Sequence, residues 1–323
     1  MATRIQIEPP TFQTLTRHSV LFSILLGRVA LSKHNRLTAY HHTMQPERFK
    51  VATSTPKLGD VQETLLIPLY LRAKETARPD AIIRDLKAVE IVKSIDYDFS
   101  RFDSAWNIQL DCVIRTEIFD EQVNAFLQKH PDAIVVNLGC GLDGRFERLD
   151  NGRLTWFDLD MPDSIELRRQ FYEEGPRNHF LSQSMFDVSW IAALNRQPGQ
   201  AVLILVEGVF AYFEEAMIRE LFQAIANGLP GAEMLCQTIS PRYVNREAKV
   251  AAVNKTRAKF KFGVVTGREM EAWEARPEFL NEWHFIDRHR RRWRWMRYLI
   301  LLPWIYRDVY DVLKISHLRF RNV

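Results

Sequence analysis

The stretch from Ile134 to Asp160, IVVNLGCGLDGRFERLDNGRLTWFDLD, constrains the fold of this chain more than any other part of it. It begins with an apolar run over 134–138 that is short and rich in β-branched residues, as buried parallel strands are. A glycine turn follows. A second strand-like run over 154–159 comes next, and two carboxylates, Asp158 and Asp160, lie at its end. In an open α/β sheet, this order of strand, glycine turn, strand and acid forms a pocket for a ribose-bearing cofactor.

The glycine turn narrows the choice of cofactor. Gly139, Gly141 and Gly144 match the G-x-G-x-x-G pattern of dinucleotide sites. Such a site needs a helix that starts at the turn, so that its N-terminus faces the pyrophosphate. Here Asp150-Asn151-Gly152 interrupts after a short segment, which leaves little room for that helix. The pattern therefore favours a cofactor without a pyrophosphate, such as S-adenosylmethionine (SAM).

Three motifs carry a family resemblance. NLGCGLDGRFER, WFDLDMPDSIELRR and VEGVFAYF occur in this order and resemble the leucine carboxyl methyltransferase family. The closer similarity is to its bacterial branch of polyketide-type, tetracenomycin-like O-methyltransferases, and it extends from about residue 61 to the C-terminus. The family usually has threonine after the aspartate of the first motif, where this chain has Gly144.

The resemblance implies the α/β fold of class I SAM-dependent methyltransferases, a Rossmann-like sheet of seven strands with helices on both faces. Helical patterns over 61–77, 81–95 and 106–129 precede the first strand, and we expect them to form an N-terminal helical cap. Asp80 is the predicted N-cap of the second of these helices. We predict a methyltransferase domain over 51–323, divided into a cap over 51–130 and a sheet core over 131–323. Residues 1–50 are predicted to be a disordered or loosely helical extension, in preference to a targeting segment.

The remaining elements follow from apolar runs and breakers. We predict strands over 179–181, 201–206 and 232–238 and two last strands over 285–287 and 315–320, with one antiparallel strand at the edge of the sheet. Predicted helices cover 162–174, 214–227, 240–261 and 267–275.

The resemblance also implies roles for charged residues around the cofactor. The arginine of RTEIFD, Arg115, binds the carboxylate of the methionine part of SAM in the family, and a guanidinium fork suits a carboxylate. The alternative for Arg115 is a solvated helix residue. Asp160 is preferred to Asp158 as the ribose acid because it occupies the family position before Met161-Pro162. Lys57 and Arg72 are weaker candidates to close the same site.

Further cofactor contacts are expected at two strand ends. Gly139 and Gly141 let the backbone approach the cofactor closely. Ser184 and Met185 lie in the loop that faces the adenine in the family, where Asp187 is either a partner of the amino group or a helix cap. Glu207 follows the wholly apolar run AVLILV, and an unpaired buried charge is costly, so Glu207 is predicted to line the pocket.

The expected reaction is methyl transfer to oxygen. A carboxylate acceptor is already ionised and needs no base, whereas a phenol or alcohol needs one. No histidine follows a strand end where the methyl group should lie, and Tyr212 and Tyr243 are weak candidates for a base. The lack of a convincing base favours a carboxylate acceptor without excluding a hydroxyl. We therefore predict an O-methyltransferase of a small-molecule, polyketide-like acceptor with a carboxylate or hydroxyl oxygen. Methylation of a protein C-terminal carboxylate and an NAD-dependent oxidoreductase remain as alternatives.

Composition restricts the compartment and the partners. Cys112, Cys140 and Cys236 are far apart and form no C-x-x-C pair, which argues against a zinc site and favours the reducing cytoplasm. No run of 18 apolar residues predicts a transmembrane helix. Six arginines lie within 288–297 together with Trp293 and Trp295. A solvated surface is the preferred interpretation of segment 288–304, ahead of peripheral membrane contact, and we expect no nucleic-acid partner.

Overall fold

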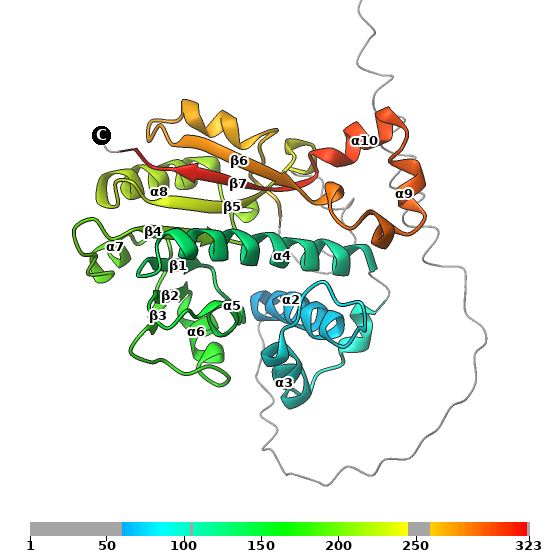
Figure 1. The fold of residues 1–323 in the computed structure, drawn as a ribbon, viewed down its shortest axis with the longest axis horizontal. Helices are drawn as coiled ribbons and strands as arrows, with labels where there is room; N and C mark the ends of the chain where they lie inside the picture. Colours follow the sequence, from blue (N-terminus) through cyan, green and yellow to red (C-terminus); the bar gives the residue numbers. More distant parts are fainter. Residues whose placement is uncertain (1–59, 104–105, 245–258, 322–323) are drawn as a thin grey trace, which may run out of the picture. The chain divides into compact units, whose positions relative to one another are not determined.

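One mixed sheet organises the part of the chain that a computed structural model describes, residues 60–103, 106–244 and 259–321 (Figure 1). Its seven strands lie in the order β3-β2-β1-β4-β5-β7-β6. Their bounds are β1 Ile134–Leu138, β2 Thr155–Asp160, β3 Asn178–Ser182, β4 Val202–Val206, β5 Glu233–Ile239, β6 Glu278–His284 and β7 Leu313–Arg319. Strands β1 to β5 pair in parallel, and β7 is antiparallel to both β5 and β6. The predicted seven-stranded sheet is confirmed.

Two predictions about the late strands are wrong. The antiparallel strand β7 lies second from the edge, and the edge strand is β6. The strand predicted over 285–287 is the 3₁₀ turn η8, Phe285–Asp287, and β6 ends one residue before it. The reason is that β6 has one neighbour, so most of its residues are only half-buried and its sequence, EFLNEWH, needs no apolar run. Phe285 and Ile286 are buried although they lie in a turn.

The core lies on both faces of the two central strands, β1 and β4, whose residues are all buried. On one face Val136 and Ile204 belong to a cluster with Trp190 of α7 (Trp190–Ala193) and Phe222 of α8 (Glu215–Gly228). Alternate residues of a strand point to opposite faces, so Val135 must face the other side. There α4, Trp106–Lys129, runs alongside the sheet and carries ten buried residues (Figure 1).

The three helices predicted to form the cap are present as α2 (Asp60–Thr76), α3 (Leu86–Ser94) and α4. Leu66 and Leu69 of α2 pack with Ile91 of α3 and with Cys140 and Leu142 of the glycine turn. The cap therefore packs directly on the turn that follows β1. Helix α3 starts later than predicted: Asp85, and not Asp80, is its N-cap and accepts a hydrogen bond of 2.9 Å from the backbone of Ala88.

Several helices differ from their predicted lengths. Helix α6, Pro162–Arg168, is shorter than the predicted 162–174, and 267–275 contains the 3₁₀ turn η7, Gly267–Ala272. Of the helix predicted over 240–261, Pro241–Tyr243 is the 3₁₀ turn η4, 259–261 is not helical, and 245–258 lies outside the described residues. The predictions for residues 1–50 and for Lys57 also lie outside them.

The remaining described elements are short. Helix α5, Arg145–Leu149, lies between β1 and β2, and the 3₁₀ turn η3, Phe210–Tyr212, follows β4. Between β6 and β7 the chain passes through η9 (Arg290–Trp293), α9 (Met296–Leu299) and α10 (Pro303–Tyr310). Within the described residues, every helix is too short or too polar to cross a bilayer.

Candidate cofactor and acceptor site

The predicted site residues gather where the parallel strands β1, β2 and β4 end. Gly139 follows β1, Asp160 is the last residue of β2, and Glu207 follows β4. Gly139 and Gly141 have φ angles of +71° and +48°, in the left-handed region that favours glycine. The Asp160 carboxylate accepts a hydrogen bond of 2.8 Å from the Gly141 backbone. The glycine turn and the predicted ribose acid are therefore in direct contact. They lie at the carboxyl ends of the parallel strands, where ligands of open α/β folds bind.

Neighbouring side chains explain the small residues of this turn. A Cβ atom on Gly139 would lie 2.5 Å from Val209, and one on Gly141 would lie 2.9 Å from Leu65 of α2. At Gly144, where the family usually has threonine, a Cβ would lie 3.1 Å from the Tyr172 hydroxyl. That hydroxyl donates a hydrogen bond of 3.1 Å to the carbonyl of Leu142, so a large residue at 172 takes the space that a side chain at 144 would need.

The two candidate ribose acids lie in different environments. The Asp158 side chain is fully buried and accepts hydrogen bonds from Trp156 (2.9 Å), Asn137 (3.1 Å) and Arg168 (2.5 Å). The Asp160 side chain is only partly buried and accepts bonds from two backbone N–H groups and from the Ser164 hydroxyl, and burial, partly opposed by these bonds, raises its pKa. These contacts favour Asp160, because Asp158 is fully buried and its charge is paired with Arg168, whereas Asp160 is partly exposed and its hydrogen-bond donors are uncharged.

Arg115 and Glu207 form an ion pair at the same carboxyl end of the sheet. Arg115 Nε lies 2.7 Å from Glu207 Oε1, and Arg115 Nη1 donates to Gln237 at 3.2 Å. No described acceptor lies along the N–H bond of Arg115 Nε, which is buried. The Arg115 guanidinium is held by Glu207 and Gln237 but remains 15% exposed, so it can meet the carboxylate of an incoming ligand. With the glycine turn and Asp160, it makes the site suitable for SAM.

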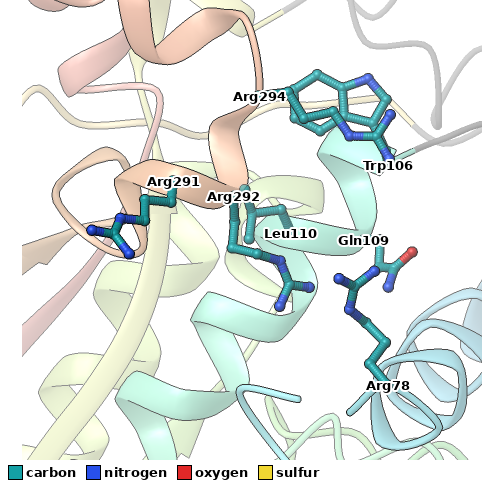
Figure 2. Close-up of a pocket in the computed structure, with 7 residues that line it drawn as sticks. All are labelled: Arg78, Trp106, Gln109, Leu110, Arg291, Arg292 and Arg294. Carbon is teal, nitrogen blue, oxygen red and sulfur yellow. The ribbon is translucent and has the colours of Figure 1, made fainter. Parts of the chain in front are cut away.

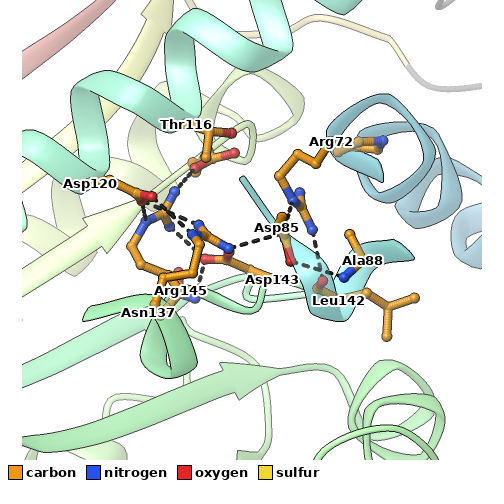
Figure 3. Close-up of polar contacts among 12 residues, drawn as sticks. Arg72, Asp85, Ala88, Thr116, Asp120, Asn137, Leu142, Asp143 and Arg145 are labelled. Carbon is orange, nitrogen blue, oxygen red and sulfur yellow. Dashed lines mark hydrogen bonds and ion pairs between the residues drawn. The ribbon is translucent and has the colours of Figure 1, made fainter. Parts of the chain in front are cut away.

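Glu207 also belongs to a chain of buried ion pairs. Figure 3 shows the part of this chain around Asp120, Asp143 and Arg145. Arg145, which is 1% exposed, donates to Asp120 at 2.6 Å, to Asp143 at 2.5 Å and to Glu207 at 2.7 Å. Arg148 continues the chain to Asp85, and Arg72 pairs with Asp85 at 2.8 Å. The members of this charge network are Arg72, Arg115, Arg145 and Arg148 with Asp85, Asp120, Asp143 and Glu207.

The charge network contains four positive and four negative groups, so it is neutral when all are ionised. Burial alone raises the pKa of a carboxyl, but the surrounding arginines lower it more at Asp85, Asp143 and Glu207, whose pKa values fall below their ordinary range. Arg72, the weaker candidate for the site, lies inside this network and also donates to the carbonyl of Leu142 at 2.9 Å. The network therefore holds Arg72 against the glycine turn.

The predicted adenine loop follows β3. Ser184 accepts a hydrogen bond of 3.2 Å from the backbone of Phe186. Met185 is buried in the core cluster that also contains Val136 and Ile204. Asp187 is exposed and accepts a bond of 3.2 Å from the Ser189 backbone, which is a contact of a turn.

The two tyrosines proposed as weak bases pack against apolar residues. The rings of Tyr212 and Phe260 lie 5.5 Å apart, and Tyr243 packs on the same small cluster. Burial, partly opposed by Arg115, raises the pKa of the Tyr212 phenol. A phenol that is harder to ionise is a poorer proton acceptor at neutral pH, so this environment favours a packing role for Tyr212.

Sequence reasoning missed Asp111, which precedes Arg115 by one turn on the same face of α4. Its side chain is partly buried and has no hydrogen bond or ion pair among the described residues. Burial, opposed only by the charge of Arg115, raises its pKa from 3.8 to about 7. The spacing Asp-x-x-x-Arg was visible in the sequence, but only burial distinguishes this carboxyl from a solvated one.

The cysteines and potential metal ligands show no further site. Cys112, Cys140 and Cys236 are free and buried. Over the described ranges, no group of three or more His, Cys, Asp or Glu side chains is arranged to hold a metal ion.

Known proteins match both the sequence and the fold. The model of the leucine carboxyl methyltransferase family matches residues 66–226. The tetracenomycin polyketide synthesis O-methyltransferase TcmP of Streptomyces glaucescens is 32% identical over 235 residues, which are 72% of this chain and 86% of that protein. The S-adenosyl-L-methionine-dependent methyltransferase dpfgK of Gibberella zeae is 32% identical over 186 residues, 53% of this chain and 62% of that protein.

The comparison with a solved structure supports the fold alone. A DUF574 family protein from Streptomyces avermitilis MA-4680 superposes with a TM-score of 0.53 at 11% identity, covering 81% of this chain and 99% of that one.

The five-residue α5 agrees with the prediction that a pyrophosphate-binding crossover helix is missing between β1 and β2. The chain thus belongs to the leucine carboxyl methyltransferase family and is an S-adenosylmethionine-dependent methyltransferase.

Proposed function

We propose that this methyltransferase acts on an oxygen atom of a small, largely apolar molecule that carries an acidic hydroxyl or a carboxylate. The relative TcmP is an O-methyltransferase of polyketide synthesis and supports this class of acceptor. When bound, SAM supplies a methyl group that its sulfonium already activates. The protein then has to hold the oxygen in line with that methyl group and keep it ionised.

The cofactor role of each residue is part of this proposal. The turn at Gly139 and Gly141 holds SAM by its backbone, and Asp160 accepts hydrogen bonds from the ribose. Arg115 binds the methionine carboxylate, and Glu207 keeps Arg115 in place. Ser184 and Met185 contact the adenine. The positive φ angles of the turn and the partial exposure of the ion-paired Arg115 support this arrangement.

The environment of Asp111 decides which class of acceptor we favour. A carboxyl that is partly buried, lacks a described partner and has a pKa of about 7 is suited to take the proton of a hydroxyl acceptor. Its negative charge, once formed, would repel a carboxylate acceptor bound beside it. We therefore favour an acidic hydroxyl, such as a phenol or enol, and retain a small-molecule carboxylate as the second choice. A protein C-terminal carboxylate is the third.

The Asp111→Asn variant is expected to lose the pH dependence of methyl transfer. In the wild type, kcat should rise as pH passes through about 7, because the Asp111 carboxyl must be ionised to accept a proton. We expect the variant to lower kcat about 100-fold at pH 8 while the Kd of SAM stays within twofold. Kinetics from pH 5 to pH 9 and calorimetric titration with SAM measure these quantities.

Stability supplies a readout that does not depend on activity. Because folding raises the pKa of Asp111, the folded state binds a proton more tightly than the unfolded state, and stability falls as pH rises from about 4 to about 7. Asp111→Asn should therefore gain stability over the wild type at pH 8 and less at pH 5. Exposed Glu166→Gln on α6 is the control and should change neither profile. A loss of SAM affinity with an unchanged pH profile would instead assign Asp111 to the cofactor amino group.

The acceptor class is tested with labelled SAM and a panel of acceptors. The panel contains polyketide-like phenols, aromatic and aliphatic acids, and peptides with free or amidated C-termini. Transfer to phenols supports the preferred class, and transfer to acids supports the second choice. Transfer only to peptides, abolished by amidation, would overturn the small-molecule proposal.

Two further expectations belong to this proposal. The dispersed, buried free thiols support a reducing compartment such as the cytoplasm. The arginine-rich segment 288–304 supports contact with a membrane surface, for which the argument follows.

A further inference from the structure

The apolar side chains most exposed to solvent are concentrated in one short segment. Nine large apolar side chains are exposed among the described residues, and four of them lie within seven residues of sequence. They are Tyr298 (60% exposed), Leu301 (69%), Leu302 (37%) and Trp304 (60%), at the end of α9 and the start of α10. Scattered apolar residues need no explanation, but a contiguous group of this kind indicates an interaction surface. We call these four residues the apolar tip.

The apolar tip is carried by an anchored segment. Trp293, Met296 and Ile300 are buried beneath it. The Trp293 indole donates a hydrogen bond of 2.8 Å to the carbonyl of Arg288, and Arg288 pairs with Glu121 of α4 at 2.7 Å. The exposure of the tip is therefore not caused by a loose end of the chain.

Positive charge lies next to the apolar tip. Arg290, Arg291 and Arg294 are exposed, and segment 288–304 contains no aspartate or glutamate. The Arg294 guanidinium lies 5.1 Å from the Trp106 ring centroid, beside a cavity of about 230 Å³. Four arginines and no carboxylate line this cavity (Figure 2). Arg78 and Arg292 pair with acids behind the cavity, which leaves Arg291 and Arg294 to meet the phosphate group of an anionic ligand.

The backbone holds these arginines at a conformational cost. His289 and Arg294, on either side of η9, have φ angles of +48° and +51°, in a region that residues other than glycine rarely adopt. His289 is held there by a contact of 2.8 Å with Glu117. Strained residues that the surrounding structure fixes in place occur mostly at functional surfaces.

The strand directions place the apolar tip at the same end of the sheet as the cofactor site, beyond the carboxyl ends of the parallel strands. Strand β6 is antiparallel to β7, which is antiparallel to β5, so β6 runs in the direction of β1 and β4. The segment from η8 to α10 connects the carboxyl end of β6 to the start of β7. It therefore lies beyond the carboxyl ends of the parallel strands, where Gly139, Asp160 and Glu207 gather. Figure 1 shows α9 and α10 at one end of β6 and β7.

We propose that the apolar tip and Arg290, Arg291 and Arg294 form a docking surface for a bilayer that contains anionic phospholipids. Tyr298, Leu301, Leu302 and Trp304 enter the boundary between head groups and acyl chains, and the arginines contact lipid phosphates. This docking turns the end of the sheet that holds the cofactor site towards the bilayer. An apolar acceptor dissolved in the membrane then reaches the site without passing through water, which extends the proposed function.

Other occupants fit this surface less well. A single-stranded nucleic acid would stack its bases on aromatic rings, but Leu301 and Leu302, half of the apolar tip, are aliphatic and offer no ring. A second copy docked tip to tip would bring the arginines of both copies together with no acid in either segment 288–304. Residues 1–50 contain seven Lys and Arg against two Glu, so their charge repels the arginines of the surface.

The proposal is tested with the full chain and vesicles. Flotation with vesicles of phosphatidylcholine alone and with an equimolar mixture of phosphatidylcholine and phosphatidylglycerol measures binding at two salt concentrations. We expect the wild type to bind the anionic vesicles at least tenfold more tightly, with affinity falling as salt rises. Leu301→Ser combined with Trp304→Ser should lower that affinity at least tenfold. Arg290→Glu combined with Arg291→Glu should remove the preference for anionic vesicles.

Matched controls separate docking from general surface effects. Leu86→Ser removes an apolar side chain that is 77% exposed on α3, and Lys129→Glu reverses an exposed charge at the far end of α4. Both should bind vesicles as the wild type does. Calorimetric SAM binding should be unchanged in all variants, because none touches the cofactor site, and this readout keeps the result distinct from failure of the proposed function.

Several results would overturn the proposal. They are a wild type that does not float with anionic vesicles, and flotation that survives Leu301→Ser with Trp304→Ser. Salt-sensitive binding to a DNA duplex without vesicle binding would assign the surface to nucleic acid. A dimer in light scattering that the same double variant abolishes, again without vesicle binding, would assign it to a second copy.

Discussion

Replacing Arg145 with alanine is expected to lower the free energy of unfolding by about 3–5 kcal/mol, the cost of removing one partner from a buried ion pair. Arg145 is 1% exposed and contacts three carboxylates, those of Asp120, Asp143 and Glu207. Without it these buried acids lose their common counter-charge. A domain is stable by about 5–15 kcal/mol, so this one change removes a large part of the total. Urea titration followed by circular dichroism measures the loss.

Two further variants make the Arg145 experiment decisive. Arg153→Ala breaks an exposed pair with Asp132 and should cost less than about 1 kcal/mol. Arg145→Lys keeps the charge but loses the fork that donates to three acids, so its stability should fall between those of the wild type and Arg145→Ala. Because Arg145 also donates to Glu207, the lysine variant should bind SAM more weakly. Equal stability of Arg145→Ala and Arg153→Ala would show that the charge network contributes little.

The central elements were predictable because their chemistry is local. The apolar run over 134–138 coincides with β1, and the helical period over 106–129 coincides with α4. A strand buried on both faces must be apolar throughout, and a long helix must repeat its apolar face every turn. Edge strand β6 has neither requirement, which is why the prediction moved it to the apolar residues Phe285 and Ile286.

The candidate site was predictable only in part. The glycines and acids lie at strand ends that the sequence reveals, and Arg115 came from a family motif. The charge network joins residues that are 25 and 62 positions apart, as in the pairs of Arg145 with Asp120 and Glu207, and local patterns carry no information on such contacts. Asp111 was missed because its proposed role depends on burial, which depends on the packing of α4.

Asp158 and Asp160 are expected to fail in different ways when each is changed to alanine. Asp158→Ala leaves the buried Arg168 guanidinium without its carboxylate and should cost about 3–5 kcal/mol of stability. Asp160→Ala removes the proposed hydrogen bonds to the ribose. It should weaken SAM binding by about 1.5–3 kcal/mol, a factor of about 10 to 150, with a smaller loss of stability.

The test compares stability and SAM affinity in the same two proteins. Arg168 also donates to the carbonyls of Gly141 and Asp143 at 3.0 and 2.7 Å, so Asp158 reaches the glycine turn indirectly through Arg168. Affinity is therefore measured by calorimetry at a temperature where Asp158→Ala is fully folded, with exposed Glu166→Ala on α6 as the charge control. A larger loss of affinity in Asp158→Ala than in Asp160→Ala would assign the ribose to Asp158. Its hydrogen bonds to Trp156 and Asn137 would then have to open when the cofactor binds.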